Sequence, residues 1–196
     1  MDMTTRYIEL IVSSLVTLLG IILSWWLRYK YGEYKAKKNN KELSQARLIQ
    51  TILEQQLVEH HAQRAFILQR HNGGKFGTGK SMNKLSTTYE ALEEGVSAES
   101  QKYQNLPMSL YSAFVNSVTK STAIYPEVES IDDILTRAFF TQRGSKSAIV
   151  FPITKNDDFV GMVGFEWTHR PKNIERTYKE ISDDGRLLGE TLSKLL

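Results

Sequence analysis

The residues with the strongest potential for chemistry form one polar, glycine-rich segment at residues 71–81. It begins with His71, Asn72, Gly73 and Gly74. An imidazole and a carboxamide beside flexible backbone offer hydrogen-bond donors and acceptors to a polar ligand. Asn-Gly-Gly is equally typical of a simple turn after a strand, which would leave His71 as an edge residue. We predict ligand binding here, with a plain turn as the alternative.

The second half of the segment matches the Walker A pattern of phosphate-binding loops letter by letter. The match runs from Gly74 and Lys75 to Gly79, Lys80 and Ser81. In such loops backbone amides surround the phosphates, the lysine reaches the terminal ones and the hydroxyl meets Mg²⁺. The rest of a nucleotide-binding fold is missing, because no later strand ends in a magnesium-binding aspartate and the last two strands form an antiparallel hairpin. We predict a flexible loop over a ligand pocket and keep a P-loop nucleotide-binding protein as an alternative.

Elsewhere the sequence predicts neither a catalytic site nor a metal site. The chain has no cysteine, which excludes disulfides and thiolate ligands. The histidines at 60–61 lie on a predicted helix without a second ligand at metal spacing, and we interpret them as solvated. The aspartate pairs at 132–133 and 157–158 are interpreted as a helix start and a turn. We predict a non-enzyme without a cofactor.

The elements that would position the segment belong to one domain at residues 64–196. Strands are predicted at 65–70, 85–92, 122–125, 146–152 and 159–167, and helices at 109–120, 131–139 and 174–195. The segment 85–92 also fits helical spacing, but its residue types favour a strand. The first strand is predicted to be half-buried, and Leu110 and Phe114 are predicted to point inward. Ser130 with Asp133 predicts a capping box. Gly185 lies in the apolar stripe of the last helix, where it would admit either the connecting helix or a second copy of the domain.

Residues 155–158 predict a hairpin turn between the last two strands, which should therefore pair antiparallel. The order of elements predicts an α+β fold, with an antiparallel sheet covered on one face by the first and last helices. This order, the flanking helices and the hairpin from Ser147-Ala-Ile-Val-Phe-Pro-Ile into Val160-Gly-Met-Val-Gly-Phe-Glu-Trp resemble GAF/PAS-like sensory domains. The resemblance covers residues 54–196 and is architectural. It implies a domain that binds a small molecule or a partner and changes how its flanking helices pair.

The N-terminal segment predicts one transmembrane helix at residues 7–28 after a short tail at 1–6. No residue from Leu10 to Leu27 is charged, and at ~1.5 Å per residue this run nearly crosses a hydrocarbon core of ~30 Å. Trp25 and Trp26 would lie at the interface, where a signal peptide would have a small-residue cleavage site. Basic residues crowd the far side of the span, at Arg28, Lys30, Lys35, Lys37, Lys38 and Lys41. The soluble domain is therefore predicted to face the cytoplasm from the cell inner membrane.

Two helical faces predict self-association. Ser13, Thr17, Gly20 and Ser24 form a stripe of small residues in the span, with Glu9 at its outer end, and small residues let helices approach closely in lipid. Residues 29–63 predict a basic juxtamembrane and connecting helix, interrupted near Gly32 and residues 39–40. Its second half has an apolar face formed by Leu48, Ile49, Ile52, Leu53 and Leu57. This face would either pair with its copy in a dimer or pack on the sheet of its own domain, and it is too short to predict a coiled coil. We predict a homo-oligomer at the lipid bilayer that does not bind nucleic acid, since the basic residues cluster beside the apolar run.

Two main functions follow. The first is a single-pass regulatory protein whose domain binds a small ligand or a protein partner and controls membrane-helix assembly or partner recruitment. The alternative is a membrane-permeabilising lysis protein, because the layout is similar to the holins of T-even phages. Residues 151–167 and the closing helix look like the end of that family's domain. That resemblance implies helices that assemble into membrane lesions under control of the soluble domain. Those holins, however, hold the domain outside the inner membrane and carry a basic N-terminal region, whereas the basic cluster here follows the helix.

Overall fold

The structure is a computed structural model that describes the backbone of residues 3–170 and 174–196. Side chains are described for residues 14–170, 178–179, 181–182, 185 and 187–196. The chain divides into two compact units, Met1–Gln45 and Ala46–Leu196. The first unit consists largely of helix α1 (Met3–Glu59), and the last turns of α1 belong to the second unit, which holds all strands.

Helix α1 runs without a break, so the interruptions predicted near Gly32 and residues 39–40 do not occur. The surrounding Lys, Glu and Ala residues favour helix strongly enough to outweigh one glycine and two asparagines. In the part of the chain that the structure describes, no helix carries an apolar stretch long enough to cross a membrane. The predicted span at 7–28 begins among residues 1–13, whose side chains, including those of Glu9 and Ser13, lie outside the described residues. The anchor therefore stays a prediction.

Six strands form one antiparallel sheet in the order β3-β2-β1-β6-β5-β4. The strands are β1 (Arg64–Lys75), β2 (Ser81–Leu92), β3 (Leu106–Pro107), β4 (Ala123–Tyr125), β5 (Ser147–Lys155) and β6 (Asp158–Trp167). All predicted strands are present, and β5 and β6 form the predicted hairpin. Its turn places Asn156 and Asp157 at φ values of 51° and 64°, which are typical of the tightest hairpin turns. The α+β prediction is confirmed.

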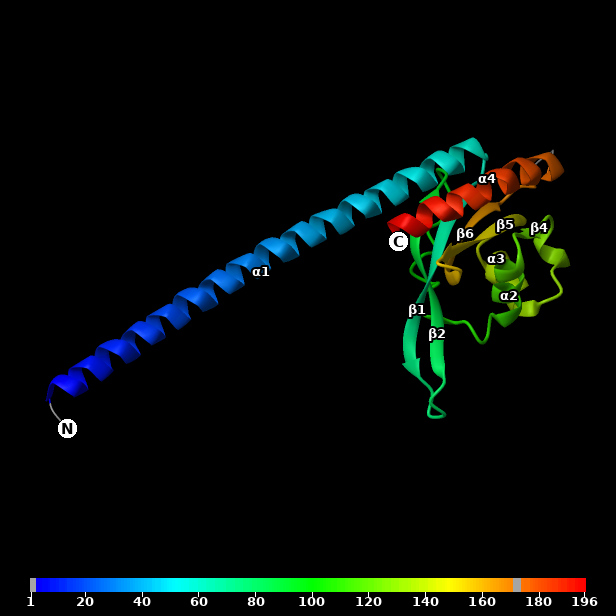
Figure 1. Ribbon diagram of the computed structural model, residues 1–196. Helices are drawn as coiled ribbons and strands as arrows, with labels where there is room; N and C mark the ends of the chain where they lie inside the picture. Colours follow the sequence, from blue (N-terminus) through cyan, green and yellow to red (C-terminus); the bar gives the residue numbers. More distant parts are fainter. Residues whose placement is uncertain (1–2, 171–173) are drawn as a thin grey trace. The chain divides into compact units, whose positions relative to one another are not determined.

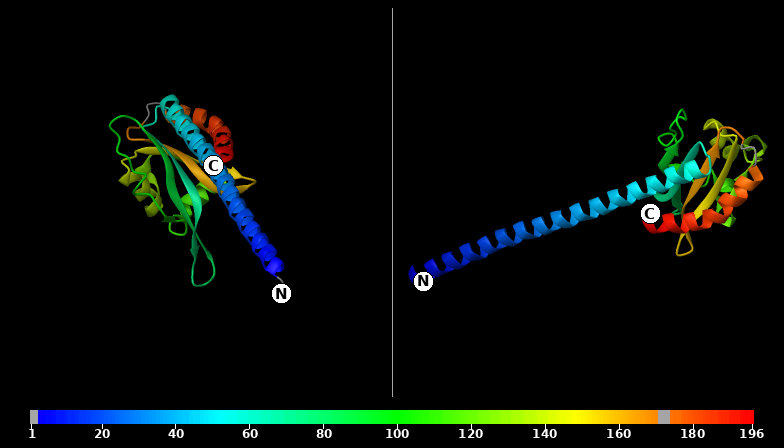
Figure 2. Two further views of the ribbon diagram at one scale, coloured as in Figure 1. Left: turned by 90° about the vertical axis from the view of Figure 1, so that its left-hand side faces the viewer. Right: turned by 90° about the horizontal axis from the view of Figure 1, so that it is seen from above.

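Helices cover both faces of the sheet, which corrects the prediction of one covered face (Figures 1 and 2). Successive side chains of a strand point to opposite faces. Ile67 of β1 packs under the last turns of α1 and under α4 (Ile174–Leu195), whereas Phe66 packs under α2 (Ser112–Lys120) and α3 (Ile134–Gln142). The start of β1 is therefore fully buried rather than half-buried. Aromatic side chains on α2 and α3 make the second layer possible: Phe114, Phe139 and Phe140.

The helix starts differ from the predictions in detail. Helix α2 begins three residues after Ser109, because the amide groups of Leu110 and Tyr111 first form a turn onto the Pro107 carbonyl. Leu110 is exposed rather than inward, while Phe114 is buried as predicted. At α3 the cap is Asp133 alone, whose carboxylate accepts the Thr136 amide at 2.7 Å. Ser130 lies instead in a short 3-10 helix, Val128–Ser130.

Close approach at Gly185 occurs, but its partner is strand β5. A side chain at Gly185 would overlap the ring of Phe151, and a Cβ at Gly189 would lie 2.8 Å from the Pro152 carbonyl oxygen. The predicted partners, the connecting helix or a second copy, are not what this glycine contacts. The glycines let α4 lie directly on the sheet, which fixes the position of the C-terminal helix.

The end of α1 corrects one interpretation of the histidines. His60 follows the helix and is buried, with its ring 5.3 Å from that of Phe165 and its Nε2 3.0 Å from the Gln56 Oε1. It therefore belongs to the core rather than to solvent, whereas His61 is exposed. Within the described residues, no group of three or more potential ligands could hold a metal ion.

Candidate functional site

A cluster of buried charged side chains lies at the end of the sheet where β1 begins. Arg64 starts β1 and pairs across the ladder with Glu166, near the end of β6. Glu90 comes from β2, and Arg143 follows α3 at its C-cap. The side chains of Glu166 and Arg143 are completely buried, and those of Arg64 and Glu90 are only 2% and 5% exposed. Charged residues are rarely buried this fully unless they are paired.

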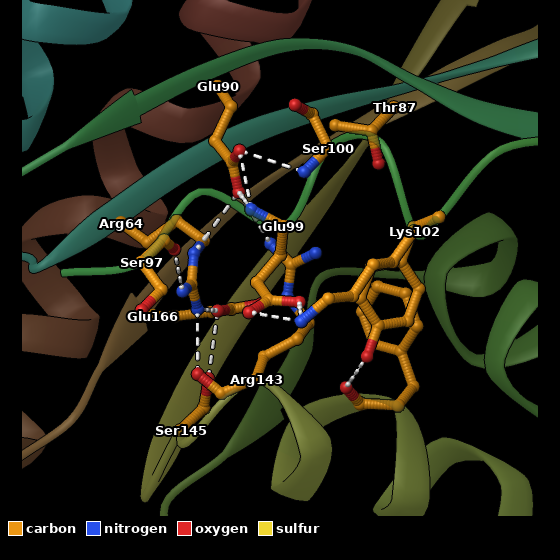
Figure 3. A network of polar contacts seen from close by, with 12 residues as sticks. Arg64, Thr87, Glu90, Ser97, Glu99, Ser100, Lys102, Arg143, Ser145 and Glu166 are labelled. Carbon is orange, nitrogen blue, oxygen red and sulfur yellow. Dashed lines mark hydrogen bonds and ion pairs between the residues drawn. The ribbon is translucent and has the colours of Figure 1, made fainter.

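The pairing is extensive and balances two positive against two negative charges (Figure 3). The Glu166 carboxylate accepts hydrogen bonds from Arg64 Nη1 at 2.6 Å, Arg143 Nε at 2.7 Å and Ser145 Oγ at 2.8 Å. The Glu90 carboxylate lies 3.2 Å from Arg64 Nε and 3.7 Å from Arg143 Nη2. Because each carboxylate contacts both guanidinium groups, the four side chains form one unit rather than two separate ion pairs.

The cluster also holds the loop that follows β2. The Glu90 carboxylate accepts the backbone amides of Glu99 at 3.0 Å and Ser100 at 2.9 Å. Arg64 Nη2 donates to the Ser97 carbonyl at 2.9 Å. These bonds connect residues 97–100 to strands β1 and β2. A change in the cluster would therefore be transmitted to this loop.

Arg143 has an unusual environment for a charged group. Its guanidinium carbon lies 4.7 Å from the ring centroid of Phe66, 4.9 Å from that of Tyr103 and 5.1 Å from that of Phe139. The terminal nitrogens Nη1 and Nη2 donate no hydrogen bond to the described residues. Burial raises the pKa of the Tyr103 phenol, an effect that the nearby Arg143 charge partly opposes. Aromatic faces and Glu166 thus stabilise a cation that keeps unused donors.

A cavity of about 480 Å³ adjoins the cluster. Arg64 and Arg143 both line it, together with the exposed carboxylates of Glu93 and Glu94. Its other lining residues are Gln63, Gly95, Val96, Ser97, Glu99, Gln142, Gly144, Thr168 and His169. This size suits a small molecule, and the lining is unusually polar and charged for a ligand pocket. A ligand that carries polar or charged groups would match it best.

The cavity lies where both flanking helices join the sheet. Gln63 connects the end of α1 to β1, and Thr168 leaves β6 on the way to α4. The Gln63 side chain accepts the Thr168 amide at 3.2 Å, and its backbone bonds to the carbonyl of Glu166 and the amide of Glu93. The two helix junctions are therefore bonded to each other at the cavity wall.

The predicted ligand segment lies at the other end of β1, and none of its residues lines the 480 Å³ cavity. His71 Nε2 is 2.8 Å from Ser86 Oγ, and Asn72 Oδ1 accepts the Gly74 amide at 2.9 Å. Asn72, Gly73 and Gly74 belong to strand β1 at an irregularity of the ladder, so the predicted turn is displaced to residues 76–80. Gly73 packs closely on the Lys84 stem.

The Walker A match is a β-hairpin tip in this fold. Lys75 ends β1, Gly79 and Lys80 lie in the turn, and Ser81 begins β2, which pairs antiparallel with β1. A P-loop needs a helix at this point, because the helix N-terminus completes the phosphate site. The nucleotide-binding alternative is therefore wrong for this segment on topology. Whether the segment binds another ligand stays a prediction.

Sequence reasoning missed the buried cluster, although a signal was present. Arg64 and Glu166 each adjoin or interrupt an apolar strand, in Arg-Ala-Phe-Ile-Leu and Gly-Phe-Glu-Trp. A charged residue at a position that alternation assigns to the core needs a partner of opposite charge. Pairing the two strands would have identified Arg64 and Glu166 as neighbours. Arg143, in a loop, carries no such signal.

Comparisons with known proteins define the fold. No protein-family model matches the chain, and no curated protein matches it. The structure is similar to the GAF domain region of a proposed membrane protein from Geobacter sulfurreducens, with a TM-score of 0.59, 12% identity, and coverage of 81% of this chain and 97% of that one. A far-red cyanobacteriochrome photoreceptor has a TM-score of 0.54 and 17% identity, with coverage of 86% of this chain and 96% of that one. The phycocyanobilin-bound GAF domain of a cyanobacterial phytochrome has a TM-score of 0.54 and 15% identity, with coverage of 82% of this chain and 90% of that one.

These likenesses show a GAF-like fold for this chain. The predicted architecture, an antiparallel sheet with N- and C-terminal flanking helices, is confirmed at that level. At such low identity they carry the fold alone. The comparisons give no support to the predicted holin resemblance.

Proposed function

We propose that this protein is a membrane-anchored sensor whose GAF-like domain binds a small polar ligand in the 480 Å³ cavity and transmits binding through its flanking helices. One observation carries the proposal: the cavity lies at the bonded junctions of α1 and α4 with the sheet. A ligand there would contact the elements that connect to both helices. The GAF-like fold supports it, since such domains are typically sensory and ligand-binding.

The mechanism rests on two helix arrangements of different ligand affinity. A ligand shifts such an equilibrium only by its differential affinity for the two states. Gln63 and Thr168 are bonded to each other and line the cavity, so an occupant that changes this bond changes both helix junctions together. The exposed carboxylates of Glu93 and Glu94 line the cavity, whereas both lining arginines are already paired, so a ligand with a hydrogen-bond donor or a positive charge fits it best.

The membrane anchor is part of the proposal. The uncharged run from Leu10 to Leu27 has the length of a span, and its described part exposes large apolar side chains. Trp25, for example, is 68% exposed. Water disfavours such a surface, whereas a hydrocarbon core would bury it. Basic residues after the run favour a cytoplasmic domain at the inner membrane.

Self-association of the helices would provide the output. Leu48 on α1 and Leu187 on α4 are exposed apolar residues of the domain that a second copy would bury. Thr17, Gly20 and Ser24 lie on the described part of the small-residue stripe. Coupled pairing of these faces would change membrane-helix assembly or recruit a regulatory partner.

Ligand coupling can be tested without knowing the ligand. The chain has no cysteine, so Gln142→Cys in the full-length protein gives one thiol at the cavity, to which a benzyl methanethiosulfonate attaches a benzyl group. We expect this occupant to change amide exchange at residues 50–59 of α1 and in α4. The matched control is Thr141→Cys, an exposed neighbour that does not line the cavity. Equal exchange in modified and unmodified Gln142→Cys would reject the coupling.

The anchor has a separate test. Carbonate extraction of membranes from an expressing bacterium should leave the chain in the pellet, and a cytoplasm-specific reporter fused at Leu196 should be active. Release into the supernatant would reject the anchor. Activity only of a reporter that works outside the cytoplasm would reject the orientation and bring induced lysis back as the next assay.

A further inference from the structure

We propose that the outer part of the β1–β2 hairpin, residues 70–84, binds the surface of a bilayer that contains anionic phospholipids. Lys75, Lys80 and Lys84 would contact the headgroup phosphates, and Phe76 would enter the interface. The proposal goes beyond ligand sensing. It rests on the proposed function only in that the anchor would keep the domain near a bilayer.

The outer hairpin is a separate, protruding surface. Strand β1 pairs with β6 from Arg64 to Gln69, and beyond this point β2 is its one partner strand among the described residues. Figure 1 shows the hairpin extending past the other strands. A two-stranded hairpin without a helix over it buries little, and its side chains are available to a partner.

The charge of this surface has one sign. Residues 69–84 contain Arg70, Lys75, Lys80 and Lys84 and no acidic residue. Arg70 donates to the Phe159 carbonyl and to Asn83. None of the ion pairs found among the described residues includes any of the three lysines. Cations that remain unpaired on one hairpin favour an anionic surface, and each contributes to binding near anionic lipid.

The tip adds an apolar group to the cations. Phe76 is 44% exposed and lies directly between Lys75 and the glycine turn. Its amide donates to the Lys80 carbonyl at 2.9 Å, and the Gly79 amide donates to the Phe76 carbonyl at 2.8 Å, which holds the Phe76 backbone in the turn. Gly77 and Gly79 leave the tip without bulky side chains beside this ring. An aromatic ring flanked by lysines is typical of segments that bind at membrane interfaces.

Lipid fits this surface better than nucleic acid does. Single-stranded nucleic acid binding uses several aromatic side chains on which successive bases stack, whereas the outer hairpin has Phe76 alone between residues 70 and 84. A bilayer needs one inserted ring and a set of cations. The hairpin supplies both.

The test uses the cysteine-free chain. Full-length protein with Thr78→Cys is labelled with nitrobenzoxadiazole and reconstituted in vesicles of phosphatidylcholine alone or with phosphatidylglycerol. We expect a blue shift and quenching by nitroxide-labelled lipid only with phosphatidylglycerol, and a loss of both at high salt. Replacing Lys75, Lys80 and Lys84 by Gln should weaken the anionic-lipid response at least about tenfold, and Phe76→Ser should reduce the quenching.

The control label is Ser121→Cys, at an exposed position after α2, which should not respond. Identical Thr78→Cys spectra in the two vesicle types, or an unchanged response in the triple variant, would overturn the proposal. A shift with single-stranded RNA and none with vesicles would also overturn it. Flotation with vesicles of phosphatidylcholine alone reports the anchor independently, because the hairpin is not expected to bind them. A failed anchor and a failed hairpin contact therefore give different results.

Discussion

The two ends of strand β1 carry similar residue types in opposite environments. At its start, Arg64 belongs to a balanced cluster of buried charges with Glu90, Arg143 and Glu166. At its other end, Lys75 lies on an exposed hairpin without an acidic neighbour in sequence. A charge in the interior is stable only with a close partner, whereas a solvated charge needs none. The charged residues at the start of β1 have ion-pair partners and belong to the folded core. The lysine at the other end has no such partner among the described residues and is available to bind another molecule.

The largest expected effect is a loss of stability from a substitution in the buried cluster at the start of β1. Glu166→Gln removes the carboxylate that both arginines share, and it leaves a positive charge without compensation in the interior. We expect a loss of about 3–5 kcal/mol in the free energy of unfolding. Urea unfolding of the full-length protein in detergent, followed by circular dichroism, measures this loss.

The control is Glu129→Gln, which removes an exposed ion pair with Lys146 that has a similar distance of 2.8 Å. Its unfolding midpoint should stay close to that of the unchanged protein, because water screens and replaces such a pair. Equal unfolding midpoints for the two variants would show that the buried ion pairs of Glu166 contribute no more to stability than the exposed pair of Glu129.

A smaller effect is expected at the exposed end. Gly73→Ala would place a Cβ 2.6 Å from Lys84 Cε and 2.8 Å from the Met82 carbonyl oxygen. The lysine stem can move, but the backbone must shift, at a cost of about 1–3 kcal/mol. Because the outer hairpin has no second neighbouring strand, we expect faster amide exchange confined to residues 70–84. Gly77→Ala, which meets nothing within 4 Å, should leave exchange there unchanged.

The smallest expected effect is a pH dependence at the buried end. Burial raises the pKa of Tyr103 above its ordinary value of 10.0. Above that pH the unfolded chain loses the phenolic proton while the folded chain keeps it, so stability falls as pH rises. The contribution is complete below pH 10 and is lost as pH rises through the folded-state pKa. Urea midpoints between about pH 9 and 11 should fall less in Tyr103→Phe, and an equal fall would contradict the role of this phenol.

Sequence patterns located most elements but not the second layer of the fold. The period of the C-terminal helix and the alternation in residues 146–167 predicted α4, β5 and β6 correctly. The one-sided sheet was wrong because α2 and α3 are short, at nine residues each. Too few turns are present for their apolar positions to show which face they cover. Residues 85–92 fitted helical spacing as well as a strand, and their antiparallel pairing with β1 makes them a strand.

The candidate site could be predicted only in part. His71 and the glycines identified a feature of the chain that the structure places on an exposed hairpin. The Walker A letters were present, yet phosphate binding in a P-loop depends on a following helix that this topology replaces with a strand. The cavity residues come from segments spread between Gln63 and His169. No local spacing connects them.

The sequence by itself determined the uncharged N-terminal run, the basic residues after it, the absence of cysteine and the amphipathic final helix. These are local properties, because they depend on composition and on a period of 3.6 residues. Only the tertiary structure decided that Arg64, Glu90, Arg143 and Glu166 share one buried unit beside a cavity. Burial and ion pairing depend on which distant segments meet, and strand order, rather than spacing along the chain, brings them together.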